Sequence, residues 1–229
     1  MRIKLITGAF LGLTLIQVSH AATFNYTGTL EHVFIDDGTG SYAGAMIGDS
    51  YSGHYTTEDS VNDVTPILPC LNDACDYAFS RQSITASISN GTVTKAGTDS
   101  LLTIWDDYDL EVDDAAFINV LPGISWPVGT LLDGWLGDAF LNDGSQMLIG
   151  FISLDTSLYS SLEYRALPPD LSNTDLAVFT IEEFDAVGNT TFLGFGRLNA
   201  VQVVPIPSAV WLFSSGLIGL IGIARRKKS

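Results

Sequence analysis

Cysteine, histidine and basic residues are scarce in this 229-residue sequence, and their scarcity excludes several classes of site. The chain has 2 cysteines, 3 histidines, and 10 lysine and arginine residues against 26 aspartates and glutamates. Two cysteines cannot supply a four-cysteine zinc site, and few histidines are left to act as general bases. No Walker A loop, Gly-x-Ser-x-Gly turn or His-Glu-x-x-His sequence occurs. Common hydrolase and metalloenzyme motifs are therefore missing.

The few basic residues lie mainly at the two ends of the chain. Arg2 and Lys4 stand at the start, and four consecutive bases stand at the end. Residues 22–204 carry 26 acidic and 4 basic side chains, a formal net charge of −22. So acidic a region has no positive face for phosphate groups, which excludes nucleic acid as a partner.

The first 21 residues have the three parts of a secretory signal peptide. A short positive segment is followed by an apolar stretch over residues 5–18. Ser19 and Ala21 then supply small residues at positions −3 and −1 of a cut before Ala22. We expect residues 1–21 to direct export by the Sec machinery and to be removed, leaving the following chain outside the cytoplasm.

The C-terminal end predicts a single transmembrane helix. Residues 208–224 are mostly apolar and carry no charge. A helix of that length covers roughly 25 Å, a little less than a ~30 Å hydrocarbon core. Arg225, Arg226, Lys227 and Lys228 follow directly and hold that end on the cytoplasmic side. Both ends thus predict the same topology, with the central region outside.

A proline motif precedes this segment. Val204, Pro205, Ile206 and Pro207, followed by the glycine-bearing helix and the basic tail, resemble a PEP-CTERM sorting signal in its Val-Pro-x-Pro variant, over residues 204–229. Ile206 stands where the namesake motif has glutamate. Two prolines one residue apart keep the backbone extended, as a processing enzyme requires.

The resemblance implies a particular route and processing enzyme. Proteins with this signal belong to Gram-negative, often biofilm-forming bacteria. They are exported, held transiently in the inner membrane, and cut near the prolines by an exosortase, a membrane-embedded enzyme resembling a cysteine transpeptidase. The resemblance implies release to the cell surface or the extracellular matrix, and it says nothing about the chemistry of residues 22–203.

Residues 22–203 are predicted to form one extracytoplasmic, β-rich domain. Short stretches with a period of two are separated by Gly, Asn, Asp and Pro. Such a pattern favours an antiparallel β-sandwich of jelly-roll type. Residues 131–141 fit either a strand or a short helix. The remaining predicted strands are residues 23–30, 50–57, 77–88, 92–95, 101–112, 116–121, 147–154, 176–181 and 192–203.

Two side-chain groups in this region are candidates for a bond or a ligand. Cys70 and Cys75 enclose four residues, which in an exported protein predicts a disulfide that pins a loop. A strand over residues 101–112 would place four carboxylates on one face. That face is either a solvated surface, a Ca²⁺ site or, as in a glycosidase, a source of paired catalytic carboxylates. The four residues are Asp107, Asp109, Glu111 and Asp113.

The histidines and tryptophans leave fewer choices. His32 and His54 stand in no catalytic motif, and His54 fits a polar position on a strand. Trp105, Trp126 and Trp135 belong either to the core or to a sugar-binding surface.

The leading hypothesis is an exported, non-enzymatic surface or extracellular-matrix protein. We expect an exosortase to process it and an extracellular polysaccharide to associate with it. The alternative is a carbohydrate- or calcium-binding β-sandwich module with the same route, and the third is a secreted hydrolase. No cofactor is expected other than Ca²⁺ in that alternative.

Overall fold

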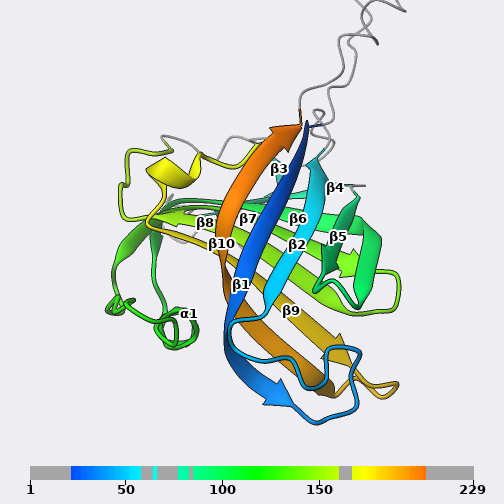
Figure 1. Cartoon of the computed structure of the whole chain (residues 1–229). Helices are drawn as coiled ribbons and strands as arrows, with labels where there is room; N and C mark the ends of the chain where they lie inside the picture. Colours follow the sequence, from blue (N-terminus) through cyan, green and yellow to red (C-terminus); the bar gives the residue numbers. More distant parts are fainter. Residues whose placement is uncertain (1–21, 58–63, 66–76, 83–84, 160–166, 205–229) are drawn as a thin grey trace, which may run out of the picture.

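The computed structural model describes residues 22–57, 64–65, 77–82, 85–159 and 167–204, and their secondary structure is mainly antiparallel β-strand (Figure 1). One α-helix, α1 (Val112–Ile118), and one 3₁₀ turn, Leu171–Asn173, accompany the strands within these residues. The expected mainly β, antiparallel class is confirmed. The strands are β1 (Ala22–Asp36), β2 (Ser50–Thr57), β3 (Val64–Thr65), β4 (Tyr77–Gln82), β5 (Ala86–Ser89), β6 (Thr94–Asp109), β7 (Leu131–Leu141), β8 (Gln146–Ser153), β9 (Leu176–Phe184) and β10 (Thr190–Val204).

Eight of these strands close into a barrel. Neighbouring strands pair in the order β6-β5-β2-β1-β10-β9-β8-β7, and β7 pairs with β6 to complete the ring. β4 pairs with the part of β6 beyond β5, and β3 pairs with β4. The predicted sandwich or jelly roll is therefore wrong. Alternation with one buried face occurs in both architectures, and only the pairing of β6 with β7, which no local pattern encodes, distinguishes them.

The barrel is filled by aromatic side chains rather than hollow. Phe24, Tyr55, Trp135 and Phe151 are fully buried and contact one another edge to face or stacked, with ring centroids 5.6 to 6.2 Å apart. Room for such large rings comes from glycine on the facing strand. A Cβ at Gly137 would lie 2.5 Å from the Tyr55 ring, so no larger residue fits at this position without movement of the ring.

Most predicted strand positions agree with the structure, with three differences. Residues 77–88, predicted as one strand, contain both β4 and β5, and the strands predicted at residues 92–95 and 101–112 belong to one strand, β6, which ends at Asp109. Residues 50–57 form β2 as predicted, and residues 131–141 form β7 rather than a helix. The predicted strand at residues 116–121 is wrong, because α1 occupies residues 112–118. Its buried Ala115 and Ile118 are three residues apart, which is the spacing of one helix face, and Asp113 and Asp114 favour the first turn.

The first and last strands of the barrel are partners. Thr23 of β1 lies opposite Val204 of β10, so the chain enters and leaves the barrel at the same end (Figure 1). No helix among the described residues is long and apolar enough to cross a membrane. The predicted signal peptide, residues 1–21, the predicted transmembrane helix, residues 208–224, and the basic tail lie outside the described residues.

Candidate functional site

A groove runs along the outside of the barrel, between α1 and the outer face of β6 to β10. We call it the outer groove. Its main cavity has a volume of about 490 Å³, and an adjoining cavity of about 250 Å³ shares four lining residues with it. These volumes together are in the range of known ligand sites. The main cavity is lined by Thr103, Trp105, Tyr108, Glu111, Asp114, Phe117, Ile118, Leu136, Asp138, Leu148, Ile152, Val178, Thr180 and Phe195.

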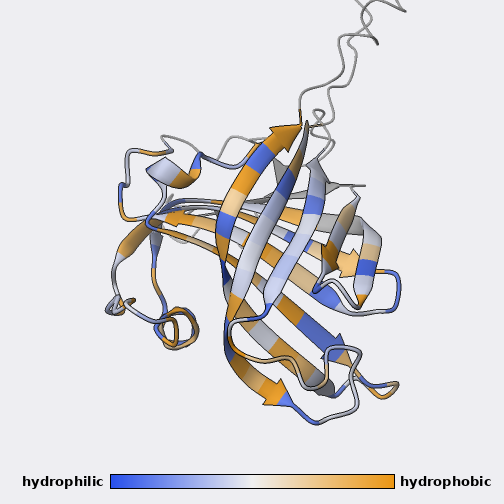
Figure 2. Ribbon diagram, in the orientation of Figure 1, coloured by the Kyte–Doolittle hydropathy of each residue, from blue (hydrophilic) through white to orange (hydrophobic). Residues whose placement is uncertain are grey.

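The floor of the outer groove follows from strand alternation. Odd-numbered residues of β7, β8 and β9, such as Trp135, face the barrel interior, so the even-numbered ones face outward. The outward residues of neighbouring strands lie side by side, and Asp138, Leu148 and Thr180 form one row. In Figure 2 apolar residues, drawn in orange, recur along the strands of the barrel. The outward face is therefore apolar with an acidic residue in the middle.

A bulge in β6 brings two aromatic rings to the same face. Trp105 pairs with Gly134 and Tyr108 pairs with Leu132. Between these two pairs, two residues of β6 lie opposite a single residue of β7, so β6 has one extra residue. Without the extra residue the two rings would lie on opposite faces. They stack instead, with centroids 4.4 Å apart and planes 14° apart. Gly134 leaves the space beneath the indole, since a Cβ there would lie 2.8 Å from the Trp105 ring.

The bulge is held by buried Asp133 and a strained residue. Asp107 has φ of 58°, in the left-handed region. Its backbone N–H donates to the Asp133 carboxylate at 3.0 Å, and the Tyr159 N–H donates to the same carboxylate at 2.7 Å. Asp133 is fully buried, so these bonds fix the position of the bulge.

Helix α1 forms the wall of the outer groove. The Tyr108 hydroxyl donates to Asp114 at 2.6 Å, which ties the stacked pair to the first turn of α1. At the other end of the helix, Phe117 stacks between Phe34 and Phe195, with centroid distances of 4.9 and 4.5 Å. These contacts hold the helix on the barrel and place aromatic surface on both sides of the groove.

Asp138 is the half-buried acid of the floor. Burial raises the pKa of its carboxyl to about 6. Among the described residues its side chain forms no hydrogen bond or ion pair. Near neutral pH this carboxylate carries its charge in a partly apolar setting without a counter-charge from the described chain.

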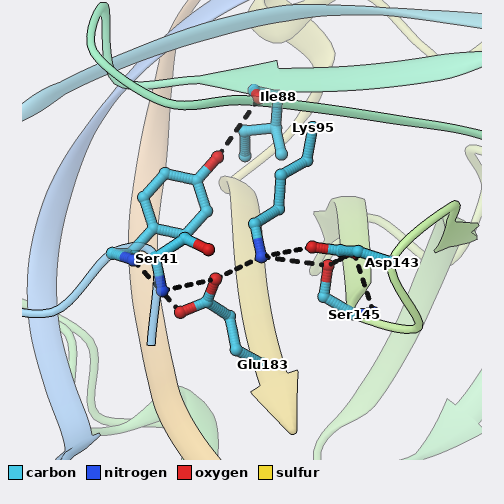
Figure 3. Close-up of polar contacts among 7 residues, drawn as sticks. Ser41, Ile88, Lys95, Asp143, Ser145 and Glu183 are labelled. Carbon is cyan, nitrogen blue, oxygen red and sulfur yellow. Dashed lines mark hydrogen bonds and ion pairs between the residues drawn. The ribbon is translucent and has the colours of Figure 1, made fainter. Parts of the chain in front are cut away.

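A second polar cluster closes the end of the barrel opposite to the two chain ends (Figure 3). We call it the barrel cap. Lys95 lies at its centre, forming an ion pair with buried Glu183 and another with Asp143 at 2.7 Å. The backbone N–H groups of Ser41 and Tyr42 donate to the Glu183 carboxylate at 3.2 and 3.1 Å. The cap thus satisfies each buried charge from within the chain.

The electrostatics of the cap point to a structural role. Burial acts to raise the pKa of Asp143, but hydrogen bonds from Lys95 and Ser145 outweigh it and lower the pKa to about 2. The Lys95 ammonium also donates to the Ser145 hydroxyl at 3.4 Å and lies 5.3 Å from the centre of the Tyr42 ring. An ammonium so fully engaged is poorly suited to act as a nucleophile or base.

The four carboxylates predicted to share a strand face do not do so. Asp107 lies in the bulge, Asp109 ends β6, Glu111 is the N-cap residue of α1, and Asp113 is in its first turn. The row on which the calcium hypothesis depended is therefore not formed. No three His, Cys, Asp or Glu side chains within the described ranges are placed to hold a metal ion.

The other predicted residues have mixed outcomes. Trp135 and Trp126 are buried, which confirms the core interpretation for both, whereas half-buried Trp105 lines the outer groove. His54 lies on β2, with Nδ1 2.7 Å from the Ser87 hydroxyl, as a polar strand position predicts. His32 contacts the Phe34 ring, with centroids 4.5 Å apart.

Several predicted residues lie outside the described residues. These are the proposed disulfide and most of the two terminal signals. Val204 ends β10, and the remaining residues of this group are Cys70, Cys75, Pro205, Ile206, Pro207, Arg225, Arg226, Lys227 and Lys228.

Sequence reasoning missed the residue at the centre of the groove floor. Asp138 stands in the mostly apolar stretch of residues 131–141, where strand and helix fitted equally well. Had a strand been chosen, the alternation with Trp135 would have placed Asp138 on the opposite, outward face. The pattern of residues 116–121 predicts a strand, and so gives no sign that Phe117 lies on a helix facing the groove.

Comparison with known proteins supplies no relative. No protein-family model matches the chain, and no curated protein or solved structure matches it either. Function is therefore inferred from the groove, the cap and the patterns of the two chain ends.

Proposed function

We propose that this chain is an exported, non-enzymatic surface or extracellular-matrix protein that binds polysaccharide in the outer groove. The observation that carries the binding role is the groove itself, an open cavity of about 490 Å³ beside α1. Stacked Trp105 and Tyr108 border it, as does Phe117. Aromatic rings offer flat apolar surface against which the C–H face of a sugar ring packs, and nearby carboxylates accept hydrogen bonds from its hydroxyls.

The closed barrel favours a glycan over a peptide in this groove. Peptides bound beside a sheet gain main-chain hydrogen bonds by pairing with a free strand edge. The groove crosses β7, β8, β9 and β10, and each of these strands is paired on both sides. Contacts must therefore come from side chains, which is the way that aromatic-lined sites hold sugars.

The proposed route is export followed by processing at the C-terminal sorting signal. An exosortase-type transpeptidase would cut near Val204, Pro205, Ile206 and Pro207 after transient anchoring in the inner membrane. In the described barrel β1 starts at Ala22, the first residue after the predicted signal peptide, and β10 extends to Val204, the first residue of the proline motif. Cuts at the two predicted positions would therefore leave both described strands whole, which is compatible with the proposed route.

The binding role is tested with a glycan array and the purified full-length chain in detergent. We expect binding to at least one polysaccharide class, and a loss of at least about fivefold in affinity on Trp105→Ala, because a stacked ring contributes on the order of 1 kcal/mol or more. Val128→Ala is the matched control, since Val128 is exposed and does not line the groove. Equal losses in both variants, or binding to no glycan, would overturn this role.

The route is tested in the native bacterium by mass spectrometry of the extracellular fraction. We expect a mature N-terminus at Ala22 and a C-terminus near the proline motif. Pro205→Ala combined with Pro207→Ala should leave the protein in the membrane fraction. Unchanged processing and location in that double variant would contradict the proposed sorting.

A further inference from the structure

The outer groove has charge of one sign. Four carboxylates border its two cavities, from Glu111, Asp114, Asp138 and Glu182. None of the described residues that line either cavity is basic. The domain around the groove is itself strongly acidic. A glycan bearing carboxylate, sulfate or phosphate would be repelled, so the groove suits a neutral or a cationic ligand.

Asp138 distinguishes between these two ligand types. Asp114 already accepts a hydrogen bond from Tyr108, and Glu182 accepts one from Thr190 at 2.8 Å. Asp138 lines both cavities and has no such partner among the described residues. A half-buried carboxylate without a partner carries a desolvation cost that a positively charged donor would offset. A neutral hydroxyl would offset less of it.

The remaining surface requires an apolar face on the same ligand. Trp105 and Tyr108 present rings, and Leu148 and Val178 present aliphatic surface beside Asp138. Phe117 contributes the edge of its ring, because Phe34 and Phe195 stack on its two faces. A cation near an aromatic face gains a further attraction from the ring quadrupole. A sugar ring that carries a protonated amine combines the apolar C–H face and the cation in one unit.

We propose that the outer groove binds a glycan of amino sugars whose amines are free and protonated, with the Asp138 carboxylate accepting the ammonium group. This inference rests on the proposed polysaccharide-binding function and names the class of polysaccharide. Acetylation of the amine removes its charge and leaves one amide N–H, a weaker donor to Asp138 than an ammonium group, so the acetylated polymer is discriminated against.

The test compares three oligosaccharides of equal length by isothermal titration calorimetry with the purified full-length chain. They are a β-1,4-linked glucosamine hexamer, its fully N-acetylated form and a glucose hexamer. We expect the glucosamine hexamer to bind at least about tenfold more tightly than the other two, because a charge-assisted hydrogen bond exceeds a neutral one. Asp138→Asn should remove that preference, so that the glucosamine hexamer no longer binds more tightly than the other two.

Asp170→Asn is the matched control. Asp170 is exposed, its side chain caps no helix, and it does not line the groove, so its replacement removes the same charge elsewhere. Equal weakening in both variants would overturn the proposal, since it would show attraction by net charge alone. Equal binding of the three hexamers, abolished by Trp105→Ala, would also overturn it but would leave the proposed function intact. Binding of a cationic peptide and of no glycan would overturn both.

Discussion

The barrel cap and the outer groove each contain a carboxylate that is shielded from water. In the cap this carboxylate has partners within the described chain, and in the groove it has none. In the cap, Glu183 is buried, pairs with Lys95 and accepts hydrogen bonds from two backbone N–H groups. In the groove, Asp138 is half-buried, has no partner among the described residues, and has a pKa raised to about 6 by burial. The cap is complete within the chain and serves folding, whereas the raised pKa of Asp138 predicts that its ionised form lowers stability, in a place where a ligand can reach it.

Removing the cation of the cap gives the largest expected effect. Lys95→Met leaves the Glu183 carboxylate buried without its counter-charge. We expect a loss of about 3 to 5 kcal/mol in the free energy of unfolding, the range measured when one partner of a buried ion pair is deleted. Urea unfolding at pH 7 measures this loss.

The ion pair of Arg197 with Glu31 provides the control for Lys95→Met. Its two charged atoms are 2.9 Å apart, but the side chains are 31% and 25% exposed. Arg197→Met should therefore cost less than Lys95→Met, about 1 to 2 kcal/mol, because solvent still reaches part of the Glu31 carboxylate that loses its partner. Similar losses for the two variants would show that the ion pair of the cap contributes no more to stability than a partly exposed ion pair elsewhere on the barrel.

The next largest loss of stability is expected for an alanine placed in the barrel interior, compared with an alanine placed on the groove floor. Gly137→Ala puts a Cβ 2.5 Å from the fully buried Tyr55 ring, which Phe24 and Trp135 hold in place. We expect a loss of about 1 to 3 kcal/mol, typical of overpacking. The control is Gly150→Ala on the groove floor, where the nearest atom is a Val178 methyl at 3.2 Å. Unfolding of the control should change by less than about 1 kcal/mol, and a larger loss there would indicate a groove packed as tightly as the interior.

Asp138→Asn, unlike the preceding substitutions, should raise the free energy of unfolding near neutral pH. The pKa of the Asp138 carboxyl in the folded protein, about 6, lies above its ordinary value of 3.8, so protonation of this group favours the folded state. That stabilisation is complete below pH 3.8 and is lost as the pH rises through about 6. The wild type should lose about 1 to 2 kcal/mol relative to Asp138→Asn between pH 4 and pH 7.5, after allowance for partial exposure.

Urea unfolding at both pH values measures this change, with Asp170→Asn as the control that should follow the wild type. A difference between wild type and Asp138→Asn that does not grow with pH would show that the Asp138 carboxylate is adequately solvated. The groove would then no longer contrast with the cap.

The strands were predictable from the sequence, and their closure was not. Period-two alternation placed β2 correctly because each strand buries one face, whatever the architecture. Nothing local encodes the closure of the ring, since it requires β1 to pair with β10, where Thr23 lies opposite Val204, as well as β6 to pair with β7. The same limit applies to the bulge at Asp107, which depends on buried Asp133 and so places Trp105 beside Tyr108 only in the folded barrel.

For the candidate sites, too, local features were predictable from the sequence and long-range contacts were not. The excess of acid was plain from composition, yet the predicted row of four carboxylates assumed that the strand continued past Asp109. The helix that begins at Val112 redirects that segment and builds the groove wall. Lys95, one of only four bases in residues 22–204, was visible as a scarce charge. Its pairing with Glu183, 88 residues away, depends on the closed sheet.

The smallest effect lies at the rim of the cap. Asp143 is half exposed, with 48% of its side chain accessible, so solvent screens its ion pair with Lys95. Asp143→Asn keeps an oxygen that accepts from Ser145 and removes only the charge. We expect a loss of about 0.5 kcal/mol at pH 7.

This loss should depend on pH. Since the pKa of Asp143 in the folded protein is about 2 against an ordinary 3.8, its contribution to stability is present above pH 3.8 and disappears as pH falls through about 2. Acid unfolding of the wild type and of Asp143→Asn measures this change. A loss as large as that of Lys95→Met would make Asp143, and not Glu183, the main partner of the buried ammonium.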